Sequence, residues 1–451
     1  MVHQFKNNGY DIVLDVNSGA IHVVDDVTYY VIAMYEEHTK EEILAALSDK
    51  YSEAEIREAM DEVEQLRENE ELFTEDVYEN HIIDFKKRPT VVKALCLHIA
   101  HDCNLACKYC FAEEGEYHGR RALMSYKTGK QALDFLIANS GNRRNLEVDF
   151  FGGEPLLNFD VVKQLVAYGR EQEKLHDKHF RFTLTTNGVL LNDDIMEFAN
   201  KEMDNVVLSI DGRKEVHDHM RPFRKGAGSY DLIVPKFQKL ADSRNQERYY
   251  VRGTFTHYNT DFSKDVLHLA DLGFKQISVE PVVAQPTDDY ALTEEDLPVL
   301  FEEYDKLAAE MVRRNKEGNA FNFFHFMIDL EGGPCVYKRL SGCGSGTEYL
   351  AVTPWGDLYP CHQFVGNEDF LMGNVWDGIK RNDIQDEFKC CNVYAKEKCR
   401  NCFARFYCSG GCAANSYNFH GSITDAYDLG CELQKKRIEC AIMIKAAEAE
   451  N

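Results

Sequence analysis

Apolar and polar positions follow one pattern over the first 88 of the 451 residues. Apolar residues recur at every second position from Tyr10 to Val16, and a second apolar run, Ile21 to Val24, follows the turn-forming Asn17-Ser18-Gly19. This pattern predicts a β-hairpin. Helical spacing and two capping boxes then predict three helices, over residues 29–37, after Thr39 and after Ser52. A hairpin and three short helices make up a small α+β module.

The pattern changes near residue 89, where apolar, β-branched runs alternate with segments long enough for a helix. The six runs cover residues 94–99, 146–151, 181–186, 205–210, 250–256 and 275–281. Repeated strand-helix units predict a parallel α/β sheet, either doubly wound or part of a barrel. Polar motifs directly follow several runs, at the carboxyl ends where barrel enzymes place their chemistry. A partial (β/α)6 barrel is therefore the favoured fold.

Residues 331–451 form a third segment, because they contain eleven of the fifteen cysteines and have little aliphatic periodicity. A segment of this composition is expected to depend on metal ligation for its fold. The sequence therefore predicts three domains, over residues 1–88, 89–330 and 331–451. The first of these resembles a winged helix, a fold that often binds DNA.

The net charge is -25, and residues 1–80 hold 21 Asp and Glu against 5 Lys and Arg. Nucleic acid and anionic membranes bind clustered Lys and Arg, so neither is expected as a partner. No apolar run has membrane-spanning length, and the first residues do not resemble a signal peptide. Many cysteines without an export signal predict metal or redox chemistry in the cytoplasm rather than disulfide bonds.

Three cysteines, Cys103, Cys107 and Cys110, stand in the run HDCNLACKYC after the first barrel strand. Thiolates are the usual ligands of [4Fe-4S] clusters, and three of them leave one iron open. An open iron can bind a chelating molecule, and S-adenosylmethionine (SAM) is a chelating cofactor of radical chemistry. A zinc knuckle is the alternative for a lone CxxC, but the full triplet favours the cluster.

A second motif, Gly152-Gly153-Glu154-Pro155, directly follows the second barrel strand. Glycines let the backbone approach a ligand, and a carboxylate or carbonyl accepts hydrogen bonds from an amine. Together with the triplet, this motif resembles the radical SAM superfamily. The resemblance implies SAM contacts by Tyr109 and Phe111 (adenine), by Gly152, Gly153 and Glu154 (methionine amine), by Asn187 and Ser209 (ribose), by Arg221 (carboxylate) and by Val282 (adenine). Turn chemistry remains the alternative for Asn187 and Ser209, a plain buried strand end for Val282, and Arg224 competes with Arg221.

The C-terminal segment carries Cys399-x2-Cys402-x5-Cys408-x3-Cys412, with Cys343 and Cys361 before it and Cys431 after it. Seven cysteines with these gaps exceed one tetrahedral zinc site. The pattern resembles the SPASM domain, which binds two auxiliary clusters. The resemblance implies one cluster on Cys399, Cys402, Cys408 and Cys431, and another on Cys343, Cys361 and Cys412. With the triplet, the implied cofactors are three [4Fe-4S] clusters and SAM.

The auxiliary cluster on Cys343, Cys361 and Cys412 is one ligand short in this count. Cys335 is a possible fourth ligand, although it precedes Cys343 by eight residues where fully ligated relatives have a step of six. An open iron that binds a substrate thiolate is the alternative. Cys390 and Cys391 are adjacent, so we interpret them as spare or redox-sensitive thiols.

The whole layout resembles radical SAM/SPASM maturases that form thioether (sactionine) cross-links in small "six cysteines in forty-five" (SCIFF) peptides. The resemblance implies an oxidoreductase that generates a 5'-deoxyadenosyl radical. It also implies a Cys-rich precursor peptide, bound through its leader by residues 1–88, and an electron donor such as flavodoxin or ferredoxin. Alternatives are a carbon-carbon cross-link, epimerisation or formylglycine formation in another peptide, and a non-enzymatic iron-sulfur sensor. His362 stands where formylglycine-forming relatives have an aspartate.

Overall fold

The N-terminal module consists of a three-stranded antiparallel sheet and three helices. The computed structural model describes residues 1–79, 87, 90–330 and 336–449. The strands are β1 (Val2–Asn7), β2 (Tyr10–Asp15) and β3 (Ile21–Val24), in the order β1-β2-β3. The helices are α1 (Asp26–Met34), α2 (Lys40–Leu47) and α3 (Glu53–Glu68). The predicted hairpin and both capping boxes are confirmed, whereas β1 was not predicted.

The large sheet contains all six predicted barrel strands, paired in parallel in chain order. They are β4 (Ala94–His101), β6 (Asn145–Gly152), β7 (His179–Thr186), β8 (Asn205–Ser209), β9 (Tyr249–Phe255) and β10 (Gln276–Pro281). Short β5 (Ala122–Leu123) pairs with β4, and β11 (Asn322–Phe323) extends the far edge beside β10. The fold is therefore mixed α/β with a large, mainly parallel sheet.

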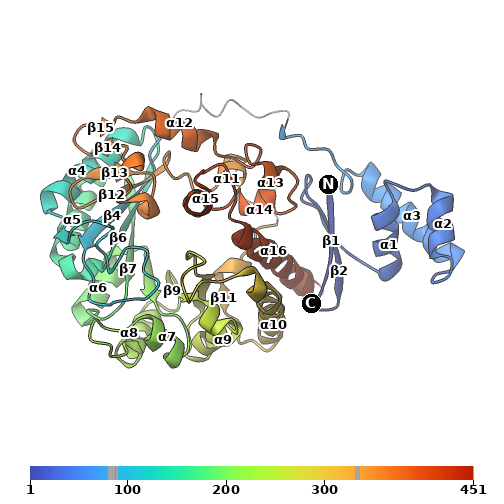
Figure 1. Ribbon diagram of the computed structural model, residues 1–451, viewed down its shortest axis with the longest axis horizontal. Helices are drawn as coiled ribbons and strands as arrows, with labels where there is room; N and C mark the ends of the chain where they lie inside the picture. Colours follow the sequence, from blue (N-terminus) through green and yellow to red (C-terminus); the bar gives the residue numbers. More distant parts are fainter. Residues whose placement is uncertain (80–86, 88–89, 331–335, 450–451) are drawn as a thin grey trace.

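Helices follow the barrel strands and cover the outer side of the curved sheet (Figure 1). They are α4 (Tyr126–Asn139), α5 (Phe159–His176), α6 (Asp193–Glu202), α7 (Lys214–Met220), α8 (Tyr230–Ser243), α9 (Ser263–Asp271) and α10 (Leu297–Lys316). Alternate strand residues face these helices, so Leu146, Val148 and Phe150 of β6 are fully buried. The intervening residues face the concave side, which is partly open and polar.

The C-terminal segment continues the same sheet across the predicted domain boundary at residue 330. Its strand β12 (Tyr349–Val352) pairs in parallel with β4, and β13 (Asp357–Tyr359), β14 (Gly373–Asn374) and β15 (Gly378–Ile379) follow in antiparallel order. Its helices are α11 (Val336–Ser341), α12 (Asn382–Cys390), α13 (Glu397–Arg400), α14 (Arg405–Cys408), α15 (Ala413–His420) and α16 (Asp428–Ala449). The parallel sheet and the cysteine-rich segment therefore share one framework.

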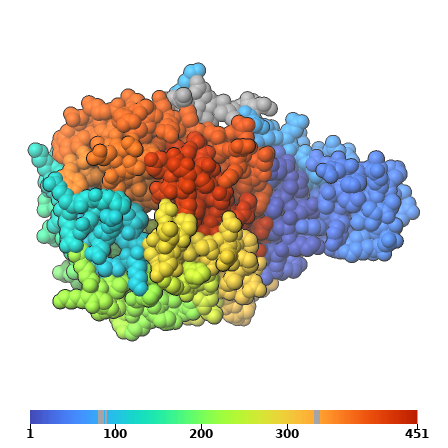
Figure 2. Space-filling model, viewed as in Figure 1, coloured from blue at the N-terminus to red at the C-terminus, as the bar shows by residue number. Residues whose placement is uncertain are grey.

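The α1–α3 part of the N-terminal module projects from one end of the molecule (Figure 2). Its sheet lies against the C-terminal helix, because β1 packs along α16. His3 stacks on Phe403, with 3.5 Å between the ring centroids, and its Nε2 lies 2.9 Å from a carboxylate oxygen of Glu439. Asn7 donates to Asp305 at the other end of β1. No helix among the described residues is long and apolar enough to cross a bilayer.

A buried ion pair fixes the module to the C-terminal segment. The guanidinium of Arg405, which is only 5% exposed, donates to Asp76 at 2.8 Å and to the side-chain oxygen of Asn17 at 2.6 Å. Tyr394 also donates its hydroxyl to Asp76. A buried charge is stable only when it is paired, so this contact depends on the single carboxylate of Asp76.

Replacing that carboxylate should destabilise the protein. We expect Asp76→Asn to lower the free energy of unfolding by about 3 kcal/mol, because it leaves the charge of Arg405 buried without an anion. Chemical denaturation of the full chain measures this. Glu53→Gln is the matched control, since it breaks an exposed ion pair with Arg57 on α3 and should cost less than about 0.5 kcal/mol. Equal effects of the two substitutions would contradict the role given to Asp76.

Candidate functional site

A cavity opens on the concave side of the sheet, at the carboxyl ends of its parallel strands. The three cysteines of the triplet, Cys103, Cys107 and Cys110, line it. Eight of the nine residues expected to contact SAM line the same cavity: Tyr109, Phe111, Gly152, Gly153, Asn187, Ser209, Arg221 and Val282. The structure thus brings together residues from four strand ends and the cysteine loop. Their ligand roles remain predictions.

The cysteine loop and the Gly152-Gly153 segment touch through their backbones. A Cβ atom on Gly152 would lie 2.3 Å from the carbonyl oxygen of Ala100, and one on Gly153 would lie 2.2 Å from that of Asp102. The N–H of Gly153 donates to Ala100 and that of Glu154 donates to Asp102. Only glycine permits this contact, so the two motifs are held beside one another.

Glu154 is the predicted SAM contact that does not line the cavity. Its carboxylate is fully buried and accepts hydrogen bonds from the backbone N–H groups of Leu156 and Asn187 and from the Thr186 hydroxyl. Burial raises the pKa of Glu154 to about 7, although these hydrogen bonds act in the opposite direction. The Glu154 side chain therefore fixes the end of β7, and the backbone of Gly152 and Gly153 is what faces the cavity.

A buried carboxylate that was not predicted, Asp211, organises the opposite wall. It accepts hydrogen bonds from the Tyr109 hydroxyl at 2.7 and 2.8 Å, from Arg221 Nε at 3.0 Å and from the backbone N–H of Thr254 at 2.9 Å. The Arg221 guanidinium also lies over the Tyr109 ring. Burial opposes the charge of Arg221, but Asp211, Tyr109 and Cys107 raise its pKa, so this cation persists beside the triplet.

Arg224, the competitor of Arg221 in the sequence, lies outside the cavity. Its guanidinium donates to the Asp102 carboxylate at 3.0 Å and to the carbonyl oxygen of Cys103 at 2.6 Å. It also lies 3.4 Å from Glu114. Arg224 therefore holds the cysteine loop from its outer side, and of these two arginines only Arg221 lines the cavity.

The remaining walls of the cavity carry a polar pair and several rings. Arg252 of β9 and Glu280 of β10 form an ion pair with 2.8 Å between Nη2 and Oε1. His362 comes from the C-terminal segment and lies beside Phe111 and Phe151, with ring centroids 5.5 and 5.1 Å apart. Burial lowers the pKa of His362 to about 4, with a contribution from the charge of Arg252. This part of the cavity is suited to a substrate with both polar and apolar groups.

The four cysteines expected to hold one auxiliary cluster, Cys399, Cys402, Cys408 and Cys431, lie together. Burial and the neighbouring thiolates of Cys408, Cys399 and Cys402 raise the pKa of Cys431 to about 12. The thiol of Cys408 is close to Cys399 and Cys402, and the nearby backbone N–H groups of Gly411 and Gly410 act against the rise of its pKa. N–H groups directed at sulfur are a regular means of tuning iron-sulfur clusters.

The second auxiliary set, Cys343, Cys361 and Cys412, also comes together. Burial raises the pKa of Cys361, and the neighbouring thiolates of Cys412 and Cys343 raise it further. Burial raises the pKa of Cys412, and the nearby backbone N–H groups of Asn415 and Ala414 act against that rise. The possible fourth ligand, Cys335, lies outside the described residues.

Within the described residues, no three His, Cys, Asp or Glu side chains converge on one metal-ion position. In a [4Fe-4S] cluster each thiolate binds a different iron, so its ligands stand further apart than those of one ion. Clustered thiols with backbone N–H groups near their sulfurs therefore fit iron-sulfur clusters better than zinc. The cation of Arg221, beside the triplet, fits the carboxylate of a SAM molecule.

Comparison with known proteins identifies the family. The 4Fe-4S single cluster domain family matches residues 92–234. An uncharacterized protein of Methanocaldococcus jannaschii is 30% identical over 70% of this chain and 96% of its own length. The radical SAM cyclopropyl synthase TigE of Paramaledivibacter caminithermalis is 23% identical, over 76% of this chain and 72% of its own. The cysteine-type anaerobic sulfatase-maturating enzyme of Clostridium novyi is 24% identical, over 75% and 92%.

The chain belongs to the radical SAM/SPASM-type maturase family. Solved structures agree in fold. The protein anSMEcpe with bound AdoMet superimposes with a TM-score of 0.67 at 20% identity, covering 80% of this chain and 96% of that one. Streptococcus suis SuiB bound to its precursor peptide SuiA gives 0.53 at 16% identity, covering 95% and 98%. The prediction of a radical SAM enzyme is therefore confirmed, and the iron-sulfur sensor is set aside.

In this radical SAM enzyme, Asp211 should control SAM affinity. We expect Asp211→Asn to weaken SAM binding by about tenfold or more, because the neutral amide leaves Arg221 without its carboxylate and releases the Tyr109 hydroxyl. Calorimetric titration of the reconstituted protein with SAM measures the affinity.

Arg224→Lys is the control for this substitution, since Arg224 binds the cysteine loop from outside the cavity. It should leave SAM affinity within about twofold of the wild type, a difference of less than 0.5 kcal/mol. An Asp211→Asn protein that retains wild-type affinity and iron content would rule out the organising role of Asp211.

Proposed function

We propose that the protein is a maturase that joins a cysteine sulfur to a carbon atom, as a thioether, in a small ribosomally made Cys-rich peptide. In this proposal the triplet cysteines hold the cluster that binds SAM. The sets Cys399, Cys402, Cys408, Cys431 and Cys343, Cys361, Cys412 hold two auxiliary clusters, with Cys335 as a possible additional ligand. The total of three clusters is part of the proposal.

One observation carries the proposal: an auxiliary cysteine lies directly beside the wall of the SAM cavity. Cys361 precedes His362, and both His362 and Gln363 line the cavity with the triplet. Strand β12 makes this possible, since it pairs with β4 and carries the C-terminal segment to the same sheet edge. A substrate in this cavity is therefore close to two thiolate sets, one from each end of the chain.

Relatives that modify peptides support a peptide substrate. The sulfatase-maturating enzymes act in sulfatase maturation, and SuiB has been solved with its precursor peptide SuiA. The polar inner wall of this protein suits a peptide as well. Arg252 can donate to backbone carbonyls and Glu280 can accept from backbone N–H groups, while the rings of Phe111 and Phe151 offer apolar surface.

Bound together, the cluster and SAM supply hydrogen-atom abstraction from a substrate carbon. The residues of the chain orient the reactants and choose the carbon. Thioether formation removes one C–H and one S–H bond and creates one C–S bond, so the peptide loses two hydrogens. The auxiliary clusters supply an acceptor for the electron that remains after the first hydrogen atom and the thiol proton have left. A donor such as flavodoxin or ferredoxin supplies the electron that starts the reaction.

The N-terminal module is proposed to bind the leader of the peptide. Among the described residues, β3 pairs only with β2, so its other edge can accept a further strand. Val23 on this strand is 47% exposed. The acidic composition of residues 1–80 favours a basic leader over DNA, for which a winged helix would need a positive surface.

A carbon-carbon cross-link is the second candidate, because TigE is a cyclopropyl synthase and matches most of this chain. Epimerisation and formylglycine formation remain further alternatives. Thioether formation consumes one peptide thiol for each bond, and a carbon-carbon bond or an epimerisation consumes none. The thiol count therefore separates the thioether from these two reactions. Formylglycine formation from a cysteine also consumes a thiol, but it releases the sulfur, so the mass of the peptide separates it from the thioether.

The test uses the reconstituted full chain, SAM, a chemical reductant and a Cys-rich precursor peptide encoded beside it. We expect mass spectrometry to detect a loss of two hydrogens for each cross-link and, after alkylation, one fewer free thiol. The triple variant Cys103→Ala, Cys107→Ala, Cys110→Ala should give unchanged peptide. A two-hydrogen loss with every thiol retained would exclude the thioether and favour a carbon-carbon bond.

The leader proposal has its own test on β3. We expect Val23→Pro to reduce peptide affinity at least about tenfold, since proline removes a backbone N–H and blocks strand addition. Val23→Thr, which keeps the N–H group and the branched side chain, should bind the peptide like the wild type. Fluorescence anisotropy with a labelled leader measures both. Equal peptide affinity of the two variants, at equal iron content, would contradict the proposal that the leader binds at the β3 edge.

A further inference from the structure

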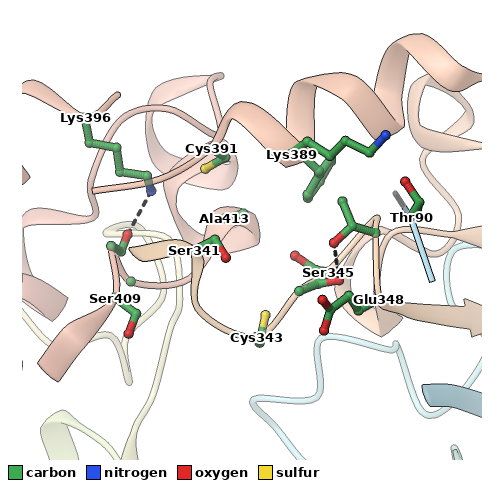
Figure 3. A pocket seen from close by; sticks show the side chains of 15 residues that line it. Thr90, Ser341, Cys343, Ser345, Glu348, Lys389, Cys391, Lys396, Ser409 and Ala413 are labelled. Atoms are coloured by element: carbon green, nitrogen blue, oxygen red, sulfur yellow. Dashed lines mark hydrogen bonds between the residues drawn. The ribbon is translucent and has the colours of Figure 1, made fainter. Parts of the chain in front are cut away.

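A pocket beside the second auxiliary set contains a buried lysine for which the family resemblance gives no role. Cys343, Cys391, Lys389, Lys396 and Ser409 are among its lining residues (Figure 3). The Lys396 side chain is 2% exposed, and its ammonium donates to the carbonyl oxygen of Gly410 at 2.9 Å. Among the described residues no carboxylate pairs directly with the Lys396 ammonium, although its charge contributes to the lowered pKa of Asp425. A buried ammonium without an anion is unfavourable, so an anionic group is expected beside it.

The ionisable groups around Lys396 include one thiol from each auxiliary set, the thiol of Cys391 and the carboxylate of Asp425. Burial raises the pKa of Cys391, Cys399 and Cys412, and the Lys396 ammonium lowers each of them again. Cys399 is expected to hold one auxiliary cluster and Cys412 the other. Lys396 therefore lies within electrostatic reach of both sets.

The hydrogen bond of Lys396 reaches the segment that joins the two sets. Gly410 lies between Cys408, of one set, and Cys412, of the other. Ser409, Gly410 and Gly411 all have positive φ angles, of 59°, 87° and 71°. This tight turn directs the Gly410 carbonyl to the ammonium, while the N–H group of Gly411 donates to the carbonyl oxygen of Cys408.

We propose that Lys396 is a counter-cation shared by the two auxiliary clusters, and that its charge raises the reduction potential of both. This inference rests on the proposed function, because it needs the auxiliary clusters. Adding one electron makes a cluster more negative by one unit, and a fixed positive charge nearby stabilises that reduced form. Lys396 is thus a positioning and tuning residue, and it would help the auxiliary clusters accept the electron released by the substrate.

Four variants separate the charge of Lys396 from its hydrogen bond. Lys396→Met removes both, Lys396→Gln keeps a neutral donor for Gly410, and Lys396→Arg keeps the charge. Lys389→Met is the matched control: Lys389 lines the same pocket, but its ammonium is 3.5 Å from Asp386 and points away from the thiols in Figure 3. All four are made in the full chain with Cys103, Cys107 and Cys110 replaced by alanine, so that only auxiliary clusters remain.

Iron content and potentiometric titration followed by electron paramagnetic resonance are the readouts. We expect about eight irons per chain, two cubes of four, in every variant. At a fixed applied potential, Lys396→Met and Lys396→Gln should lower the reduced-to-oxidised ratio at least tenfold, equivalent to 59 mV for a one-electron couple. Lys396→Arg and Lys389→Met should stay within twofold of the parent protein.

Other outcomes also test the proposed role of Lys396. Unchanged potentials in Lys396→Gln at full iron content would overturn the proposal. Loss of iron from the Met, Gln and Arg variants alike would also overturn it, since only packing would then matter. Loss of iron from Met and Gln but not from Arg would support it, because the charge would be what retains the clusters. A parent protein without auxiliary iron would instead refute the proposed function on which the inference rests.

Discussion

The site depends on one steric constraint, the absence of side chains where the end of β4 meets the end of β6. A Cβ atom at Gly152 or Gly153 would lie within 2.3 Å of a carbonyl oxygen in the segment from Ala100 to Asp102. Without this contact, the loop that carries the triplet could not rest on the Gly-Gly segment, and the thiols would not share a cavity with the strand ends. Glu154 also fixes the end of β7 relative to this contact, because its carboxylate accepts hydrogen bonds from the Thr186 hydroxyl and the Asn187 N–H.

The same sheet edge receives the C-terminal segment. Because β12 pairs with β4 in parallel, the turn that follows leads into β13 and places Cys361 and His362 near the triplet. The triplet and the C-terminal cysteines are therefore close in space although they are far apart in the sequence. Parallel pairing between distant segments lets one cavity be bounded by the first and last thirds of the chain.

Local patterns in the sequence were sufficient for much of this fold. The six parallel strands followed from buried, β-branched runs, and α2 and α3 followed from the capping boxes at Thr39 and Ser52. The β12–β4 pairing could not be predicted, since nothing local marks which strands become neighbours. Helix α16 was missed because buried residues surround several of its sides, so it has no single apolar face. Asp211 resembled an ordinary Asp-Gly turn, and only its three-dimensional contacts with Tyr109 and Arg221 reveal its role.

The buried cations of the protein reveal a common electrostatic principle. The chain is strongly acidic as a whole, yet Arg221 lies beside Cys107, and the charge of Lys396 acts on Cys399 and Cys412, one from each of the other two thiol sets. The two cations donate hydrogen bonds to different kinds of acceptor. Arg221 donates to the Asp211 carboxylate, and Lys396 donates to the Gly410 carbonyl oxygen. A carboxylate cancels much of the charge it holds, whereas a carbonyl leaves the charge nearly intact. Arg221 is therefore suited to orienting a ligand, and Lys396 to stabilising negative charge on the groups around it.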